Sequence, residues 1–275
     1  MLKISELYIY PIKSLGGISV QQAEVTDRGF KYDRRWMLVD DYNRFLSQRE
    51  VATMALLKIS LDDTGLTITN TIDTSTLLIP FNLLKNKFIE VTIWDDTCTG
   101  QLVSDEANKW FTQALGLNCR LVYMPDDSHR PTDPRYADNN ITSLSDGYPF
   151  MMIGQASLDE LNSHLDEALP MNRFRPNLVF TGGTPYQEDT MNEFAINNIC
   201  FNGVKLCARC NVTTINQDDA SKGKEPLKTL AGYRSKNKKI YFGQNVVHKG
   251  TGIIAIGDEL SVLSTQTEER FIIPS

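Results

Sequence analysis

Short runs in which apolar and polar residues alternate dominate the first hundred residues and predict β-strands. These runs cover residues 2–10, 18–25, 35–39, 57–61, 66–69 and 88–94. Turn-forming residues separate them, among them Gly16-Gly17 and the polar segments 40–43 and 62–65, which suit tight connections. This part of the chain is therefore predicted to form an antiparallel sheet or barrel.

A first helix is predicted after these strands, where apolar residues recur at helical spacing. Ser104 or Asp105 can serve as its N-cap, and Gly116 can end it. The apolar face consists of Ala107, Trp110, Phe111 and Ala114. We expect this helix to pack on the sheet.

A second helix is predicted to begin at Ser157, which with Glu160 has the spacing of a capping box. Its apolar stripe consists of Leu158, Leu161 and Leu165. Pro170 is expected to stop it, because proline cannot continue a helix.

The second half of the chain again shows short apolar runs and is predicted to be rich in strands. The runs cover residues 178–181, 199–201, 204–207, 212–215, 240–242 and 260–263. Asn202-Gly203 predicts a hairpin turn between two of them. Residues 125–140 are polar and rich in proline, so they predict an irregular connection between two domains, residues 1–125 and 126–275. The predicted fold class is α+β and β-rich, with a few helices.

Composition narrows the class of protein. The chain has 275 residues, 41% of them hydrophobic and 23% charged, which is ordinary for a globular protein. A formal net charge of −6 argues against a general nucleic-acid binder. No stretch reads as a membrane anchor or signal sequence, and five scattered cysteines indicate reduced thiols. A cytoplasmic location is expected.

Two cationic segments of the first half are candidates for binding an anion. Lys13 and Ser14 end a strand just before Gly16-Gly17, and a solvated surface lysine is the alternative. Arg34 and Arg35 are neighbours entering a strand, so alternation sends them to opposite faces and only one can point inward. An inward arginine needs a carboxylate or phosphate partner, and the preceding aspartate could supply a structural one.

A third cationic segment has arginines at positions 173 and 175. Pro176 favours an extended Arg175, so we expect Arg173 and Arg175 to share a face, either around an anion or in surface ion pairs. The turn 145–149 could bind a polar ligand through its backbone N–H groups, although ordinary turn chemistry explains it equally well. The three tryptophans are predicted to belong to the core: Trp36, Trp94 and Trp110.

The tetrad Cys207-Ala208-Arg209-Cys210 is the most distinctive chemical feature of the chain. Arg209 can favour a thiolate at a neighbouring cysteine and can also bind an anion. A zinc site would need two further ligands, and the three histidines form no zinc motif. The tetrad is predicted to lie between two strands, unlike the dithiol of a thioredoxin-like fold. A further alternative is that Cys207 and Cys210 are simply two small residues of the core.

Six motifs in a fixed order give the chain a specific resemblance. They are Tyr10-Pro-Ile-Lys-Ser, Asp33-Arg-Arg-Trp, Ser145-Asp-Gly-Tyr-Pro-Phe, Asn172-Arg-Phe-Arg-Pro-Asn, Cys207-Ala-Arg-Cys-Asn-Val-Thr-Thr and Phe242-Gly-Gln-Asn. Across nearly its whole length the chain resembles the MOSC (molybdenum cofactor sulfurase C-terminal) family with its N-terminal β-barrel domain. It looks closest to the branch that contains the mitochondrial amidoxime reducing components and their bacterial relatives.

This resemblance implies a molybdenum ion bound by molybdopterin and by one protein thiolate. Cys210 matches the family's metal ligand, which leaves Cys207 as a nearby structural or auxiliary thiol. The residues that match cofactor-binding positions are Lys13, Ser14, Arg34, Asp146, Gly147, Tyr148, Arg175, Ala208, Arg209 and Asn245. Gly147 and Ala208 stand where relatives often carry hydroxyl residues, and Asn245 where some carry an aromatic one. These three can contribute backbone contacts at most.

The implied activity is reduction of N-hydroxylated compounds, such as amidoximes, N-hydroxylated bases and hydroxylamines, by oxygen-atom transfer at molybdenum. No iron–sulfur cluster is expected, since no cysteine follows Cys210. Electrons would then come from a separate protein, a ferredoxin, a flavoprotein or a cytochrome b5-like protein. One alternative is a sulfur carrier or a protein that binds and delivers the molybdenum cofactor through the Cys210 thiolate. Another is a cofactor-free dithiol or binding module.

Overall fold

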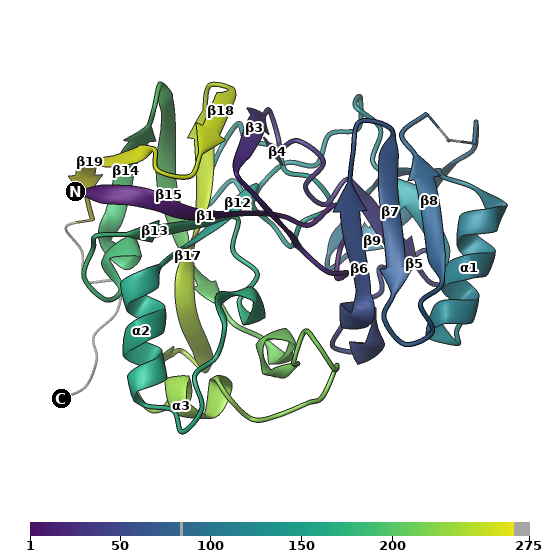
Figure 1. The fold of residues 1–275 in the computed structure, drawn as a ribbon. Helices are drawn as coiled ribbons and strands as arrows, with labels where there is room; N and C mark the ends of the chain where they lie inside the picture. Colours follow the sequence, from purple (N-terminus) through teal and green to yellow (C-terminus); the bar gives the residue numbers. More distant parts are fainter. Residues whose placement is uncertain (83–84, 267–275) are drawn as a thin grey trace.

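The computed structural model describes residues 1–82 and 85–266 and shows two β-rich lobes side by side (Figure 1). The first lobe is a closed barrel of seven strands, because β12 pairs with both β13 and β17. In order around the barrel the strands are β12 (Phe150–Gly154), β13 (Leu178–Thr181), β1 (Leu2–Ile9), β19 (Glu259–Thr265), β14 (Met191–Ile196), β15 (Ile199–Ala208) and β17 (Lys239–Lys249). The predicted β-rich α+β class is confirmed.

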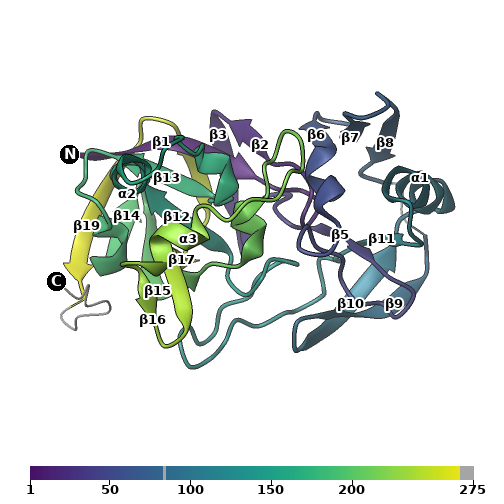
Figure 2. The same ribbon diagram turned by 90° about the horizontal axis from the view of Figure 1, so that it is seen from below.

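The second lobe contains two smaller antiparallel sheets and a helix (Figure 2). One sheet has four strands: β5 (Trp36–Val39), β11 (Arg120–Tyr123), β10 (Asp96–Leu102) and β9 (Phe88–Ile93). The other has three: β6 (Leu57–Leu61), β7 (Gly65–Asn70) and β8 (Thr76–Pro80). The helix α1 (Asp105–Leu115) lies against this lobe. The predicted strand 57–61 coincides with β6.

The remaining elements are short. They are β2 (Ile18–Val20), β3 (Gln22–Thr26), β4 (Gly29–Phe30), β16 (Ser235–Lys236), β18 (Gly252–Ala255), α2 (Gln155–Ser163), α3 (Leu227–Ala231), and the 3-10 helices η1 (Ala52–Leu56), η2 (Met171–Arg173), η3 (Gln187–Thr190) and η4 (Asn211–Thr214). Within the described ranges, no helix combines the length and hydrophobicity needed to cross a membrane. Because β1 pairs with β13 and β19, the N-terminal strand belongs to the barrel lobe. The division at residues 125 and 126 stays a prediction.

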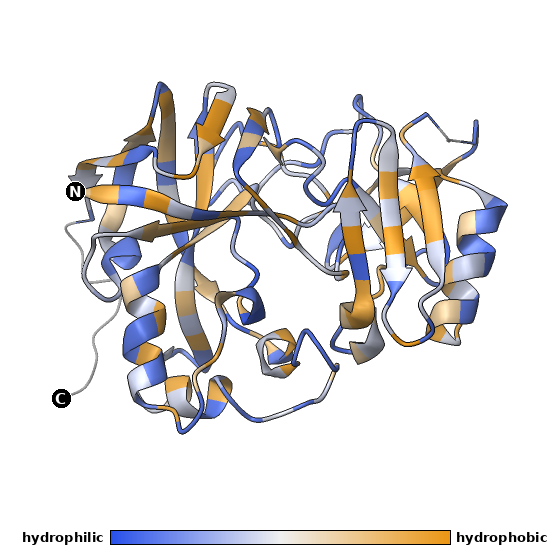
Figure 3. Cartoon of the chain, viewed as in Figure 1, coloured by the Kyte–Doolittle hydropathy of each residue, from blue (hydrophilic) through white to orange (hydrophobic). Residues whose placement is uncertain are grey.

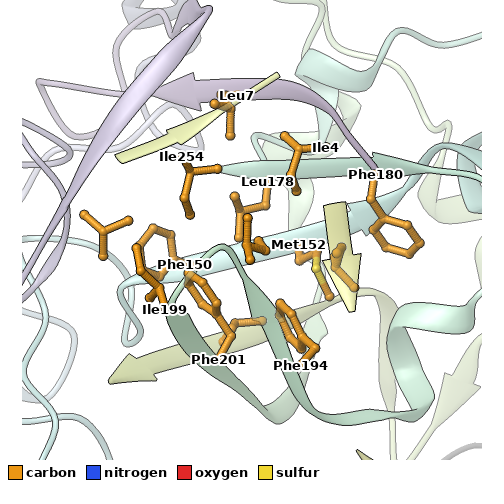
Figure 4. Packing of buried hydrophobic residues seen from close by; sticks show 14 of the residues in the cluster. Ile4, Leu7, Phe150, Met152, Leu178, Phe180, Phe194, Ile199, Phe201 and Ile254 are labelled. Carbon is orange, nitrogen blue, oxygen red and sulfur yellow. The ribbon is translucent and has the colours of Figure 1, made fainter. Parts of the chain in front are cut away.

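The barrel is filled by large apolar side chains (Figure 4). Phe194 and Phe201 stack with ring centroids 5.3 Å apart, and Phe150 meets Phe201 edge to face at 5.6 Å. Hydrophobic and hydrophilic residues alternate along β1 and β6, as expected for strands with one face in a core (Figure 3). Burial of these side chains stabilises the barrel, whose rim carries the residues of the site.

The first helix agrees with its prediction. The Ser104 side chain accepts a hydrogen bond from the Ala107 N–H over 3.0 Å, and Gly116 ends the helix with φ of 68°. Of the three tryptophans predicted to be core residues, Trp36 is buried, but Trp94 is 43% exposed. Trp94 lies at the turn between β9 and β10, beyond the paired residues.

The capping box predicted for the second helix is wrong. Helix α2 starts two residues before Ser157, with Gly154 as its N-cap, and it ends at Ser163, before Leu165 and Pro170. The buried Ser157 hydroxyl donates to the Glu188 carboxylate over 2.8 Å and accepts from the Tyr186 N–H over 2.7 Å. Ser157 therefore joins the helix to η3 instead of capping it.

The hairpin predicted at Asn202-Gly203 is also wrong, because both residues lie inside the continuous strand β15. The turn between β14 and β15 is formed by Asn197 and Asn198 instead. A Cβ atom on Gly203 would lie 2.3 Å from the Met191 carbonyl oxygen, and the pairing with β17 shifts register just after Gly203. Glycine is needed here for close approach of backbones at a bulge, not for a turn.

The predicted strand 212–215 is a 3-10 helix, η4. The Thr213 hydroxyl and N–H both donate to the Cys210 carbonyl, over 3.0 and 3.2 Å, and the Thr214 hydroxyl donates to the Asn211 carbonyl over 2.8 Å. Local hydrogen bonds from threonine side chains thus outweigh the β preference of this segment. The tetrad accordingly lies between a strand and a 3-10 turn.

Candidate functional site

One cavity brings together the residues singled out in the sequence. It is bordered by the segment after β1, the segment that enters β5, the turn 145–148, the segment after η2, and the end of β15 with η4. All eleven predicted site residues line it: Lys13, Ser14, Arg34, Asp146, Gly147, Tyr148, Arg175, Ala208, Arg209, Cys210 and Asn245. Their chemical roles remain predictions, but their proximity is a feature of the fold.

A tyrosine ring supports two of the arginines. The guanidinium carbons of Arg34 and Arg175 lie 4.1 and 4.4 Å from the centroid of the buried Tyr10 ring. The Tyr10 hydroxyl donates to the Pro176 carbonyl over 3.0 Å, and a Cβ atom on Gly17 would lie only 2.4 Å from the ring. Tyr10 is therefore held rigidly, and it fixes two cations at the cavity wall.

Arg34 is also fixed by a buried carboxylate. Its Nη1 atom donates to both Asp33 oxygens over 2.9 and 2.7 Å and to the Asn177 side chain over 3.1 Å. Burial raises the Asp33 pKa, although the Arg34 charge opposes this shift. Asp33 also accepts from the Tyr10 N–H over 2.8 Å. The opposite orientation expected for Arg35 is found, since Arg35 pairs with Asp126 at 2.6 Å and does not line the cavity.

Arg173 and Arg175 do not share a face, which corrects the prediction. Arg173 is the last residue of η2, its Nε atom donates to the Thr213 carbonyl over 2.9 Å, and Arg173 itself does not line the cavity. Arg175 has φ of 57° instead of the extended conformation expected before Pro176. Burial lowers the Arg175 pKa to about 10, and Arg175 makes no ion pair with any described residue. Arg175 is thus available to an anionic ligand, whereas Arg173 anchors η4.

Lys13 contributes a third cation and is only 5% exposed. Its Nζ atom lies 2.5 Å from Oδ1 of Asp146, which also accepts from the Trp94 indole N–H over 3.3 Å. Burial lowers the Lys13 pKa, and Asp146 opposes the shift. The protein around Asp146 raises its carboxyl pKa, but the Lys13 charge and the hydrogen bonds from Lys13 and Trp94 together outweigh this effect, so the pKa lies below its usual value.

The turn that carries Asp146 is held by a residue that the sequence analysis missed. Arg130 is 2% exposed and donates to the carbonyls of Ser143, Ser145 and Asp146 over 3.0, 2.6 and 3.2 Å. It also pairs with Asp96 at 2.8 Å. Arg130 lies in the polar segment 125–140, where its arginine neighbour at position 135 is exposed, so the composition of the segment alone could not single it out.

The two cysteines of the tetrad differ in environment. Cys207 is partly buried, and its sulfur accepts a hydrogen bond from Arg209 Nη1 over 3.0 Å. Cys210 is exposed and lines the cavity. Arg209 Nη2 donates to the Phe174 carbonyl over 2.5 Å, while its Nε atom is buried and has no hydrogen-bond partner. Cys210 therefore offers an accessible thiol in a cavity that Arg209 also lines.

These residues fit a phosphorylated organic chelator that carries a soft metal. No group of three or more histidine, cysteine or acidic side chains that could hold a metal occurs in residues 1–82 and 85–266. A metal here would take one thiolate from Cys210 and its other ligands from the chelator. The cations of Lys13, Arg34, Arg175 and Arg209 surround the same space and suit a phosphate.

Comparison with known protein families shows which family the chain belongs to. The model of the MOSC N-terminal beta barrel domain matches residues 1–118, and that of the MOSC domain matches residues 139–261. The chain belongs to the MOSC family. The MOSC domain match contains β12 to β18 and the tetrad, so it accounts for most of the barrel and one wall of the cavity.

Three relatives illustrate how far this MOSC protein resembles characterised chains. Mitochondrial amidoxime-reducing component 1 of Mus musculus is 31% identical over 279 residues, covering 94% of this chain and 82% of the relative. Mitochondrial amidoxime reducing component 2 of Bos taurus is 32% identical over 274 residues, covering 93% and 81%. Molybdenum cofactor sulfurase of Oryza sativa subsp. japonica is 31% identical over 264 residues, which span 88% of this chain but 32% of the sulfurase.

Proposed function

We propose that this protein is a molybdenum-cofactor-dependent oxidoreductase that reduces N-hydroxylated compounds. The observation that carries the proposal is the exposed Cys210 thiol in the same cavity as four fixed cations. Similarity to two amidoxime-reducing components over more than nine-tenths of the chain supports it. When bound, molybdopterin-coordinated molybdenum would supply two-electron redox chemistry at the N–O bond of the substrate.

The residues of the cavity have distinct roles in this proposal. The Cys210 thiolate is the protein ligand that tunes the metal, and Arg209, which donates to the Cys207 sulfur, lines the same cavity and stabilises negative charge there. Arg34 and Arg175, held on Tyr10, bind the phosphate of the pterin together with Lys13. Asp146 keeps Lys13 charged and oriented, since Nζ lies 2.5 Å from its carboxylate.

The reaction requires an external source of electrons. Converting an N-hydroxyl group to an N–H group consumes two electrons and two protons and releases one water molecule. A separate redox protein would therefore deliver the electrons.

The matched pair Cys210→Ala and Cys207→Ala tests the proposal. Each variant and the wild type are expressed in a molybdenum-replete host, and metal, pterin and benzamidoxime reduction with reduced methyl viologen are measured. We expect about one molybdenum per wild-type chain, and turnover at least about a hundredfold lower in Cys210→Ala. Cys207→Ala should retain most turnover. Equal turnover of Cys210→Ala and wild type would refute the role of Cys210.

A second candidate function has one observation in its favour, the 31% identity to molybdenum cofactor sulfurase. In this alternative, Cys210 carries a persulfide or holds the cofactor for delivery, and N-hydroxylated substrates are not reduced. Mass spectrometry of the purified protein separates the two functions. A gain of one sulfur atom on Cys210 without any benzamidoxime turnover would favour the alternative.

A further inference from the structure

A second hollow lies on the other side of the turn that carries Cys210. This basic groove, of about 470 Å³, is lined by Arg49, Lys222, Lys224 and Lys228 around Asn211 and Thr214. No acidic residue lines it. Arg49 belongs to the second lobe, whereas Lys222 and Lys224 lie on the loop between η4 and α3 and Lys228 lies in α3, so the cations converge on the groove from both sides.

The cations of the groove are accessible. Lys222, Lys224 and Lys228 are exposed, and among the described residues Arg49, Lys222 and Lys224 form no ion pair. Lys228 lies 4.0 Å from Glu225 and is 76% exposed. Arg49 is held over the Trp94 ring with its guanidinium carbon 4.0 Å from the centroid. The acidic neighbours Asp218 and Asp219 lie on the same loop but do not line the groove.

The groove and the cofactor cavity share a wall. Cys210, Val212 and Thr213 line the cavity, whereas Asn211 and Thr214 of the same 3-10 turn line the groove. On the other lobe, Trp94 contacts Arg49 and donates to Asp146 of the cavity. A redox centre seated at the groove would thus be separated from the metal site by a single turn of chain. A short separation favours electron transfer.

The charge of the whole protein makes this groove distinctive. The formal net charge is −6, so an acidic macromolecule is repelled by most of the surface and attracted where cations concentrate. The lysines are exposed and long, and the hydroxyl of the buried Thr214 already donates to the Asn211 carbonyl. Such a surface suits diffuse electrostatic docking of a protein better than a tight subsite for a small anion.

We propose that the basic groove is the docking surface for an acidic electron-donor protein, which delivers single electrons through η4 to the cofactor cavity. This inference rests on the proposed reductase function. Two one-electron transfers from the donor would supply the two electrons of each turnover, and the two protons would come from solvent. Electrostatic attraction at the groove would orient the donor so that its redox centre faces η4.

Charge reversal tests the docking surface. The variant Lys222→Glu/Lys224→Glu is compared with the control Lys109→Glu/Lys249→Glu, which makes the same charge change at exposed positions on α1 and β17. Binding of the intact holoprotein to an acidic plant-type ferredoxin, a flavodoxin and a cytochrome b5 haem domain is measured by calorimetry at two ionic strengths. We expect roughly ten- to hundredfold weaker binding to at least one donor for the groove variant, with a reduced salt dependence, and little change for the control.

Turnover measurements separate this inference from the proposed function. With the donor protein, the groove variant should show a KM for donor raised roughly tenfold or more. With reduced methyl viologen, its benzamidoxime turnover should equal that of the wild type. Absence of turnover with every donor would refute the reductase function, while the binding data still test the groove.

Three outcomes would overturn the docking surface itself. The first is that none of the three donor proteins binds the wild type. The second is that groove and control variants lose affinity equally, which would indicate a general charge effect. The third is that the groove variant weakens binding of adenosine monophosphate but of no donor protein, which would assign the groove to a small anion instead.

Discussion

The Lys13 ammonium donates to the Asp146 carboxylate over 2.5 Å, although 133 positions separate the two residues in the chain. This contact joins the segment after β1 to the turn held by Arg130, on one side of the cavity. Because Lys13 is buried, its charge depends on Asp146, and the cationic character of the site depends on an acidic residue.

Asp146→Asn should remove this pairing and lower stability in a pH-dependent way. The Asp146 pKa is lower in the folded protein than its ordinary value of 3.8, so its contribution is present above that pH and is lost as the pH falls further. The Asp146 side chain is 75% exposed, so we expect a loss of only about 1 kcal/mol in the free energy of unfolding at pH 7. Urea denaturation of the wild type and of Asp146→Asn, from pH 7 to about pH 3, measures the difference in the free energy of unfolding. A difference that grows on acidification would contradict the account.

Gly17→Ala should weaken cofactor retention through Tyr10. A methyl group at this position would lie 2.4 Å from the Tyr10 ring, so the ring must move and Arg34 and Arg175 lose their support. We expect a stability loss of about 1–3 kcal/mol and a severalfold drop in pterin per folded chain. Gly223→Ala is the control, since its nearest neighbouring atom is 3.8 Å away. Unchanged pterin content in Gly17→Ala would argue against the tyrosine platform.

Glu188→Gln should change how stability depends on pH. Burial, and then the neighbouring Asp189 carboxylate, raise the Glu188 pKa from 4.5 to about 8, while Ser157 opposes the shift. The folded state therefore holds a proton that the unfolded chain releases, and the free energy of unfolding falls as the pH rises from about 4.5 to about 8. Glutamine cannot ionise, so the variant should show a flatter profile in chemical denaturation. Parallel profiles of variant and wild type would show that Glu188 does not titrate in this range.

The sequence identified the site better than it identified the local geometry. The eleven candidate residues meet in one cavity, because most of them lie in segments that lead into or out of strands bordering that cavity. Alternation and turn residues placed β6 and β13 at their observed bounds, residues 57–61 and 178–181. Strong local patterns of this kind depend mainly on neighbours in the chain.

Most of the failures share a physical cause, because a contact between distant residues decides the conformation. The segment 211–214 is the exception, since local hydrogen bonds from the Thr213 and Thr214 hydroxyls favour its 3-10 turn. Gly203 lies in a strand because the Met191 carbonyl approaches it, and Arg175 adopts a positive φ where its guanidinium lies on Tyr10. Arg130 was missed because the carbonyls that it binds lie 13 to 16 positions further along an irregular segment. Sequence patterns over a few neighbouring residues carry no information about such contacts.

X-ray absorption spectroscopy at the molybdenum edge tests the central claim most directly, because it counts the sulfur atoms bound to the metal. The account predicts that wild-type protein and Cys207→Ala show the two sulfurs of the pterin dithiolene and one further sulfur. Cys210→Ala should lose that third sulfur while it keeps the pterin. An identical sulfur count in Cys210→Ala and wild type, or an absence of molybdenum from the wild type, would contradict the claim.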